Sequence, residues 1–146
     1  MRIDEMTHVV FRVGVGVLFL QHGLQKVFGM LGGFGGTPGA TAPLASLLGV
    51  AGLMELVGGV LLIVGFGVRP VAAILVLEML VAFGKAHLPK GGWPMQNGGE
   101  LPLLFALAFV FLAGNGAGRA SVDAWLLRRR HRERDAVHVS RRARAA

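Results

Sequence analysis

The chain has 146 residues, of which 53% are hydrophobic and 16% are charged, and its mean hydropathy is +0.61. Because an ordinary soluble domain carries about 25% charged residues, this composition excludes that class and indicates a membrane protein. The net charge of +7 lies mostly in residues 128–146, where eight arginines oppose Glu133 and Asp135, so the basic balance describes a tail and excludes a nucleic-acid-binding domain.

The chain contains no cysteine. Disulfide bonds, thiol redox catalysis, zinc sites with Cys ligands and Cys-ligated iron–sulfur clusters are therefore excluded within it, and we expect no metal site. No small-residue cleavage site follows the first apolar stretch, so we expect that stretch to be retained rather than removed as a signal peptide.

Four apolar stretches separated by Gly- and Pro-rich links predict four membrane-spanning helices, because one span needs roughly 20 mostly apolar residues. The predicted spans are residues 6–30, 44–66, 70–88 and 100–114. The predicted fold is thus an all-α membrane protein, with a four-transmembrane-helix bundle in residues 1–127. Residues 128–146 are predicted to form a disordered, Arg-rich cytoplasmic tail that contacts anionic lipids.

The distribution of basic residues predicts the orientation in the bacterial cytoplasmic (inner) membrane. With four spans, both termini lie on one side, which collects Arg2, Arg69, Arg119 and the eight tail arginines. The opposite side holds Lys26, Lys85 and Lys90. Eleven basic residues against three place both termini in the cytoplasm by the positive-inside rule.

Charged residues occur within or at the ends of every predicted span. Each charge near the bilayer centre costs at least about 2.5–3.5 kcal/mol, so such residues pair with one another or line a cavity. Counting residue depth along each helix places Arg12 and Glu78 at similar levels in the inner half. We therefore predict a buried charge network of Arg12 and Glu78, with Glu55 near mid-bilayer as a further member. Its simplest role is structural.

A second polar group is predicted in the outer half. It comprises His22, Gln25, Lys26, Lys85, His87 and Glu100. Lys85 lies seven residues after Glu78, which puts the two on one helix face. The histidines could hydrogen-bond a quinone carbonyl with help from Lys26 or Gln25, or they could bind haem iron. A His near a span end more often forms a local hydrogen bond, which argues against haem, and Glu100 can equally serve to complement a helix N-terminus.

Small residues on the predicted spans favour close helix packing. Gly16 and Gly23 share a stripe with Arg12, and Gly58 with Gly59 lies on the face that carries Glu55. Glycines at helical spacing let two backbones approach closely in lipid. A homodimer through the Gly58/Gly59 face is one use of this surface.

Several motifs in this order resemble the DoxX family. Arg12 is followed by His22-Gly23-Leu24-Gln25-Lys26, then by Glu55-Leu56-Val57-Gly58-Gly59 and Gly65-Phe66-Gly67-Val68-Arg69. His87 closes the third span, Asn97-Gly98-Gly99-Glu100-Leu101 opens the fourth, and residues 116–123 close it. The resemblance covers residues 8–125. It implies a small, mostly bacterial four-helix membrane protein, similar in some relatives to the membrane subunit of a thiosulfate:quinone oxidoreductase and in others linked to thiol-redox systems or to assembly of membrane proteins.

Three functions remain open from the sequence. The first is a redox-linked membrane subunit that binds a quinone or another small lipophilic ligand in the outer-half cavity. Its electrons would come from a protein partner or from the substrate itself, since no self-contained catalytic motif is present. The second is a non-catalytic scaffold or assembly subunit that works with a protein partner or as a homo-oligomer. The third is a small transporter or proton relay that uses Glu55, Glu78 and Lys85, although no broken-helix repeat supports it.

Overall fold

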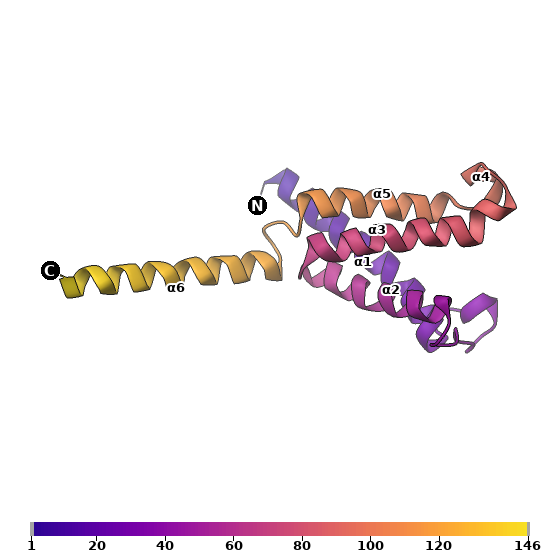
Figure 1. The fold of residues 1–146 in the computed structure, drawn as a ribbon, viewed down its shortest axis with the longest axis horizontal. Coiled ribbons are helices and arrows are strands. Elements are labelled where there is room, and N and C mark those ends of the chain that lie inside the picture. The colour runs from indigo at the N-terminus through magenta and orange to yellow at the C-terminus, as the bar shows by residue number, and fades with distance from the viewer. Residues whose placement is uncertain (1, 146) are drawn as a thin grey trace.

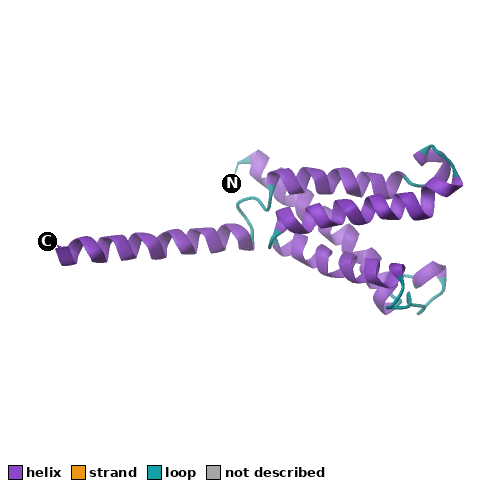
Figure 2. Cartoon of the chain, in the orientation of Figure 1, coloured by secondary structure: helices purple, strands orange, loops and turns teal. Residues whose placement is uncertain are grey.

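The computed structural model describes residues 2–145, and side chains within residues 2–134. Four long helices dominate the fold: α1 (Ile3–Phe28), α2 (Leu47–Val64), α3 (Val68–Ala82) and α5 (Glu100–Asn115). Each overlaps one predicted span, so the helical part of that prediction is confirmed, and no strand occurs in the described residues. Figure 2 shows the predominance of helix.

The four long helices lie side by side, with short connections at one end and longer ones, residues 29–46 and 83–99, at the other (Figure 1). α1 packs chiefly on α2, α3 packs on α5, and α2 joins the two pairs. The chain begins at the end where α2 turns into α3 and where α5 leads to α6 (Val122–Ala145); we call this the inner end. The opposite, outer end holds the α1–α2 link and the segment between α3 and α5.

Glycines allow the backbones of α1 and α2 to touch. A Cβ on Gly23 would lie 2.6 Å from the Leu56 Cα and 2.9 Å from the Gly52 carbonyl oxygen. A Cβ on Gly59 would lie 2.9 Å from the Leu20 Cα. The predicted close packing of small residues is therefore confirmed.

Gly58 and Gly59 pack against helices of their own chain. A Cβ on Gly59 would meet α1, and a Cβ on Gly58 would lie 3.0 Å from the Leu75 side chain of α3. Both glycines are therefore buried within one chain, and a homodimer through this face of α2 stays a prediction.

Hydrogen bonds tie the inner end together. The buried Arg12 guanidinium donates to the carbonyls of Leu62 and Ile63 in the last turn of α2, and to Ala120 in the α5–α6 link at 2.8 Å. A cation suits this position, because the last carbonyls of a helix are unpaired and carry partial negative charge. Nearby, the Arg119 guanidinium hydrogen-bonds the partly buried Glu5 carboxylate at 2.9 Å and lowers the pKa of that group.

Asp123 connects α6 to the start of α3. Its carboxylate accepts hydrogen bonds from the Gly67 N–H at 2.9 Å and the Val68 N–H at 3.3 Å, and its own N–H donates to the Gly65 carbonyl at 3.0 Å. Ser121 caps α6 by accepting a hydrogen bond from the Ala124 N–H, whereas Asp123 bonds the start of α3.

The outer end of α3 departs from regular helix. Residues Phe83–His87 form a π-helical turn and Leu88–Lys90 a 3₁₀ turn, followed by the short helix α4 (Pro94–Asn97). In the π turn the Leu88 N–H bonds to the Phe83 carbonyl, five residues earlier. This extra residue per turn rotates the side chains that follow it.

The C-terminal segment also differs from the sequence-based expectation. Where a disordered tail was predicted from residue 128, the structure continues α6 to Ala145. Arginine and alanine favour helix, and Arg129 pairs with Glu133 one turn away at 3.1 Å, which offsets part of the repulsion between arginines. The side chains of the last tail arginines, from residue 135 onward, lie outside the described residues.

Two helical segments in the described residues are long and apolar enough to cross a membrane by length and composition. They are Leu47–Val64, with mean hydropathy 2.4, and Val68–Lys90, with mean hydropathy 1.8. α5 is apolar but has 16 residues, or about 24 Å of helix. α1 has 26 residues and is more polar.

We expect Gly23→Ala to lower the thermal unfolding midpoint of the protein in detergent, because the added methyl group would overlap the α2 backbone. Overpacking of this kind costs about 1–3 kcal/mol. Gly14→Ala is the matched control on the same helix, since a Cβ there meets nothing within 4 Å. Equal midpoints for the two variants would contradict the backbone contact.

We expect Arg12→Lys to destabilise the protein although it keeps the charge, because one ammonium group cannot reach the three carbonyls that the guanidinium bonds. Losing one hydrogen bond from a charged donor costs about 1.5–3 kcal/mol. The measurement is again the thermal unfolding midpoint, with exposed Arg129→Lys as the control. A midpoint for Arg12→Lys as high as that of the control would show that the fork geometry is unimportant.

Candidate functional site

An ion pair between α1 and α2 lies in the middle of the molecule. The Lys26 ammonium contacts the Glu55 carboxylate, and the two side chains are 18% and 4% exposed. Lys26 is near the outer end of α1, but helical side chains lean toward the helix N-terminus, so its ammonium reaches inward along the bundle. The pair thus joins two helices that already touch through their glycines.

Glu78 of α3 is the second carboxyl group at this site. It is 9% exposed, and neither carboxylate oxygen has a hydrogen-bond partner among the described groups. Glu55 and Lys26 both lie within electrostatic range of it, and Oε2 of Glu55 is also unpartnered. Lys26 pairs with Glu55, so the site holds one ammonium group for two buried carboxyl groups, and Glu78 has capacity for a proton, a hydrogen-bond donor or a cation.

His22 completes the site from α1. It lies one helical turn before Lys26, within electrostatic range of it, and its ring meets the edge of Phe105 of α5 at 5.8 Å between centroids. Its ring nitrogens have no hydrogen-bond partner among the groups that the structure describes. All four long helices therefore contribute to the surroundings of this polar group.

The predicted pairing of Arg12 with Glu78 is wrong. Arg12 bonds main-chain carbonyls at the inner end, and Glu55 pairs with Lys26 rather than with Arg12. The prediction counted depth from the beginning of each apolar stretch. α1 extends beyond the inner end of α2, so that Arg12 is level with the α2–α3 turn, whereas Glu78 lies about 15 Å farther along α3.

The predicted outer group is not assembled as one site. Lys85 and Glu100 are exposed and form no ion pair within residues 2–134. Lys85 is separated from Glu78 because it lies in the π turn, which rotates it off the face that carries Glu78. Gln25 bonds weakly to the Leu31 carbonyl at 3.5 Å.

His87 belongs to the outer connection instead. Its Nδ1 lies 3.1 Å from the Asn97 carbonyl oxygen, and its ring stacks on Phe83. Asn97, which the sequence reasoning did not single out, is 5% exposed and bonds both the Gly91 carbonyl and the Gly99 N–H. The Asn-Gly-Gly sequence at 97–99 was the available signal, since Asn side chains often bond nearby backbone in turns.

The geometry therefore reduces the candidate site to four residues: His22, Lys26, Glu55 and Glu78. They offer a cation, an imidazole that can donate or accept, and carboxyl oxygens without protein partners. In the described residues no group of three His, Cys, Asp or Glu side chains is arranged to hold a metal ion. The chemistry available to these side chains is hydrogen bonding and proton exchange.

Comparison with known proteins adds three relatives. An uncharacterized protein of Haemophilus influenzae is 37% identical over 115 residues, covering 77% of this chain and 84% of its own. The "Putative oxidoreductase CatD" of Bacillus subtilis is 29% identical, and the match covers 85% of this chain and 90% of that protein. An uncharacterized membrane protein of Mycobacterium tuberculosis is also 29% identical, and the match covers 83% of this chain and 82% of that protein. No solved structure matches the chain significantly.

The DoxX family model matches residues 8–88, which include α1, α2, α3 and all four residues of the candidate site. With this match and the similarity to the Haemophilus protein, the chain belongs to the DoxX family of membrane proteins.

Proposed function

We propose that this protein is a four-span protein of the bacterial inner membrane, with both termini in the cytoplasm, that binds a quinone as a redox-linked membrane subunit. The observation that carries the proposal is the buried Glu78 carboxyl group, whose oxygens have no partner beside the Lys26–Glu55 pair. The relative named as an oxidoreductase supports a redox role.

The depth of the site suits a ligand that dissolves in the membrane. Glu78 lies ten residues after the start of α3 and Glu55 nine before the end of α2, or about 15 and 14 Å along their helices. A bilayer core is about 30 Å thick, so both carboxyl groups lie near its middle. Ionisable residues at that depth mark ligand or proton pathways when they face the bundle interior.

The side chains match the requirements of a quinone head group. Reduction of a quinone takes up two electrons and two protons, and its carbonyl oxygens accept hydrogen bonds. His22 and a protonated Glu78 can each donate to a carbonyl oxygen, and the Lys26 ammonium favours developing negative charge there. Electrons come from a partner protein in this proposal.

The test is solvent extraction and mass spectrometry of protein purified in mild detergent. We expect a quinone at close to one molecule per chain, and we expect Glu78→Leu to lose most of it, because a leucine side chain cannot donate a hydrogen bond to a quinone carbonyl. Folding of that variant should be unimpaired, since the change removes an unpartnered polar group from an apolar interior. Glu100→Leu, which removes an exposed carboxyl at the start of α5, is the matched control.

Recovery of bulk phospholipid alone from the wild-type protein would refute quinone binding, and so would unchanged quinone content in Glu78→Leu. An absorption spectrum of the same sample distinguishes haem, whose bands would assign the histidines to iron instead. His22→Ala provides a second variant, because it removes the imidazole without altering the ion pair.

A proton relay is the second candidate, and it rests on two buried carboxyl groups near one ammonium group, which contacts Glu55. A proton that moves from Glu78 to Glu55 would change which carboxylate Lys26 neutralises, which is what a relay site requires. We expect a relay to produce proton flux in liposomes that contain the protein, and Glu55→Gln to abolish it. Flux equal to that of empty liposomes would exclude this function.

A further inference from the structure

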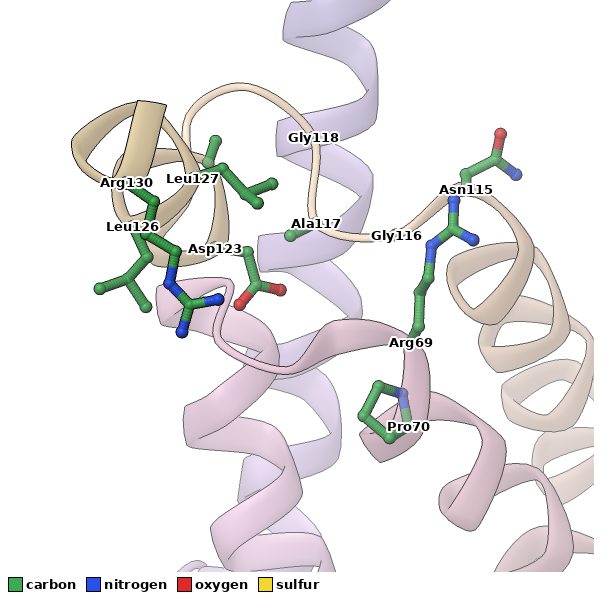
Figure 3. Close-up of a pocket in the computed structure, with 11 residues that line it drawn as sticks. Arg69, Pro70, Asn115, Gly116, Ala117, Gly118, Asp123, Leu126, Leu127 and Arg130 are labelled. Atoms are coloured by element: carbon green, nitrogen blue, oxygen red, sulfur yellow. The ribbon is translucent and has the colours of Figure 1, made fainter. Parts of the chain in front are cut away.

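A hollow of about 470 Å³ lies at the inner end, remote from the candidate site. Its walls are the start of α3, the link between α5 and α6, and the first turns of α6 (Figure 3). Polar lining comes from Arg69, Asn115, Asp123 and Arg130, and apolar lining comes from Pro70, Leu126 and Leu127. In Figure 3, Arg69 and Arg130 lie on opposite sides of Asp123.

The hollow carries unbalanced positive charge. Arg69 and Arg130 are exposed, and neither forms an ion pair or hydrogen bond within the described part of the chain. Asp123 is the one acid in the lining, but its oxygens are bonded by the Gly67 and Val68 N–H groups, and the buried Arg12 lies within electrostatic range of it. Two free guanidinium groups therefore face the hollow while the carboxylate is already satisfied.

The hollow lies at the level where we expect the lipid head groups. Arg69 is the second residue of α3 and Asn115 the last of α5, so the hollow begins where two apolar helices end. Trp125 and Phe66 are 52% and 47% exposed near this end, and large aromatic side chains favour the membrane–water interface. The apolar wall of Leu126 and Leu127 adjoins the guanidinium groups.

We propose that this hollow binds the phosphate of an anionic phospholipid. The guanidinium groups of Arg69 and Arg130 bond the phosphate oxygens from two sides, and Pro70, Leu126 and Leu127 contact the glycerol and the upper acyl chains. Guanidinium suits this task because its planar fork matches phosphate oxygens. The lipid would join α6 to α3 beside the contact that Asp123 already makes.

The test is native mass spectrometry of the full chain in detergent, titrated with dioleoylphosphatidylglycerol or dioleoylphosphatidylcholine. We expect the first phosphatidylglycerol to bind more tightly than phosphatidylcholine. The double variant Arg69→Gln/Arg130→Gln should weaken it roughly 25-fold, from two basic contacts at about 1 kcal/mol each. Arg132→Gln/Arg134→Gln removes the same charge from α6 outside the hollow, and should leave the affinity unchanged.

Equal weakening by the two double variants would overturn the proposal, because it would mean diffuse attraction to the tail rather than a site. Equal affinity for the two lipids would overturn it as well. Inorganic phosphate in large excess tests whether the hollow is a site for free phosphate. If phosphate displaces phosphatidylglycerol, and if phosphate without lipid raises the unfolding midpoint, the lipid assignment is wrong. Should the double variant fail to fold, Arg130→Gln alone is expected to show about a fivefold loss.

Discussion

The backbone contact between α1 and α2 fixes much of the remaining structure. Gly23 lies against the Gly52–Leu56 segment and Gly59 lies against Leu20, so the two antiparallel helices have one register in which they can approach this closely. In that register Lys26 meets Glu55, and Arg12 meets the last carbonyls of α2. A shift by one helical turn would clash at the glycines and strand both cations away from their partners.

The same register sets the electrostatic problem at the candidate site. Lys26 is satisfied by Glu55, which leaves Glu78 as an additional carboxyl group in an apolar interior. An unpaired ionised group there would cost several kcal/mol. The group is therefore held neutral by a proton or it bonds something outside the chain, and both states fit a protein that exchanges protons with a bound ligand.

The sequence was sufficient for the helices and for the faces that pack, because apolar length and glycine spacing report directly on those features. It was insufficient for the pairing of charges. Depth estimates assumed that every helix begins at the same membrane level, whereas α1 begins well before the inner end of α2 and α3. The π turn at Phe83–His87 likewise has no simple sequence signal, and it separates Lys85 from the face that carries Glu78.

The candidate site itself was half predictable. His22 and Lys26 were assigned to one polar group in the outer half, and Glu55 and Glu78 were recognised as buried acids. Combining them required knowing that the Lys26 side chain leans inward and that the terminal nitrogens of Arg12 bond main-chain carbonyls. Main-chain acceptors at a helix end leave no trace in side-chain composition, so a search for opposite charges alone assigns Arg12 to the nearest acid.

Charges within the helices and charges at the inner end have different physical roles. Charges inside the helices are few, and Lys26 and Glu55 neutralise each other, because each unpaired charge there is costly. Arginines at the inner end are numerous and several are free, because at a lipid surface an exposed guanidinium gains from anionic head groups instead of losing hydration. Arg12 combines features of both groups of charges. It is 1% exposed, yet its guanidinium group hydrogen-bonds main-chain carbonyls, two of them at the end of α2, rather than an acid. It can therefore anchor α1 without placing a second negative charge in the interior, where Glu78 already lacks a partner.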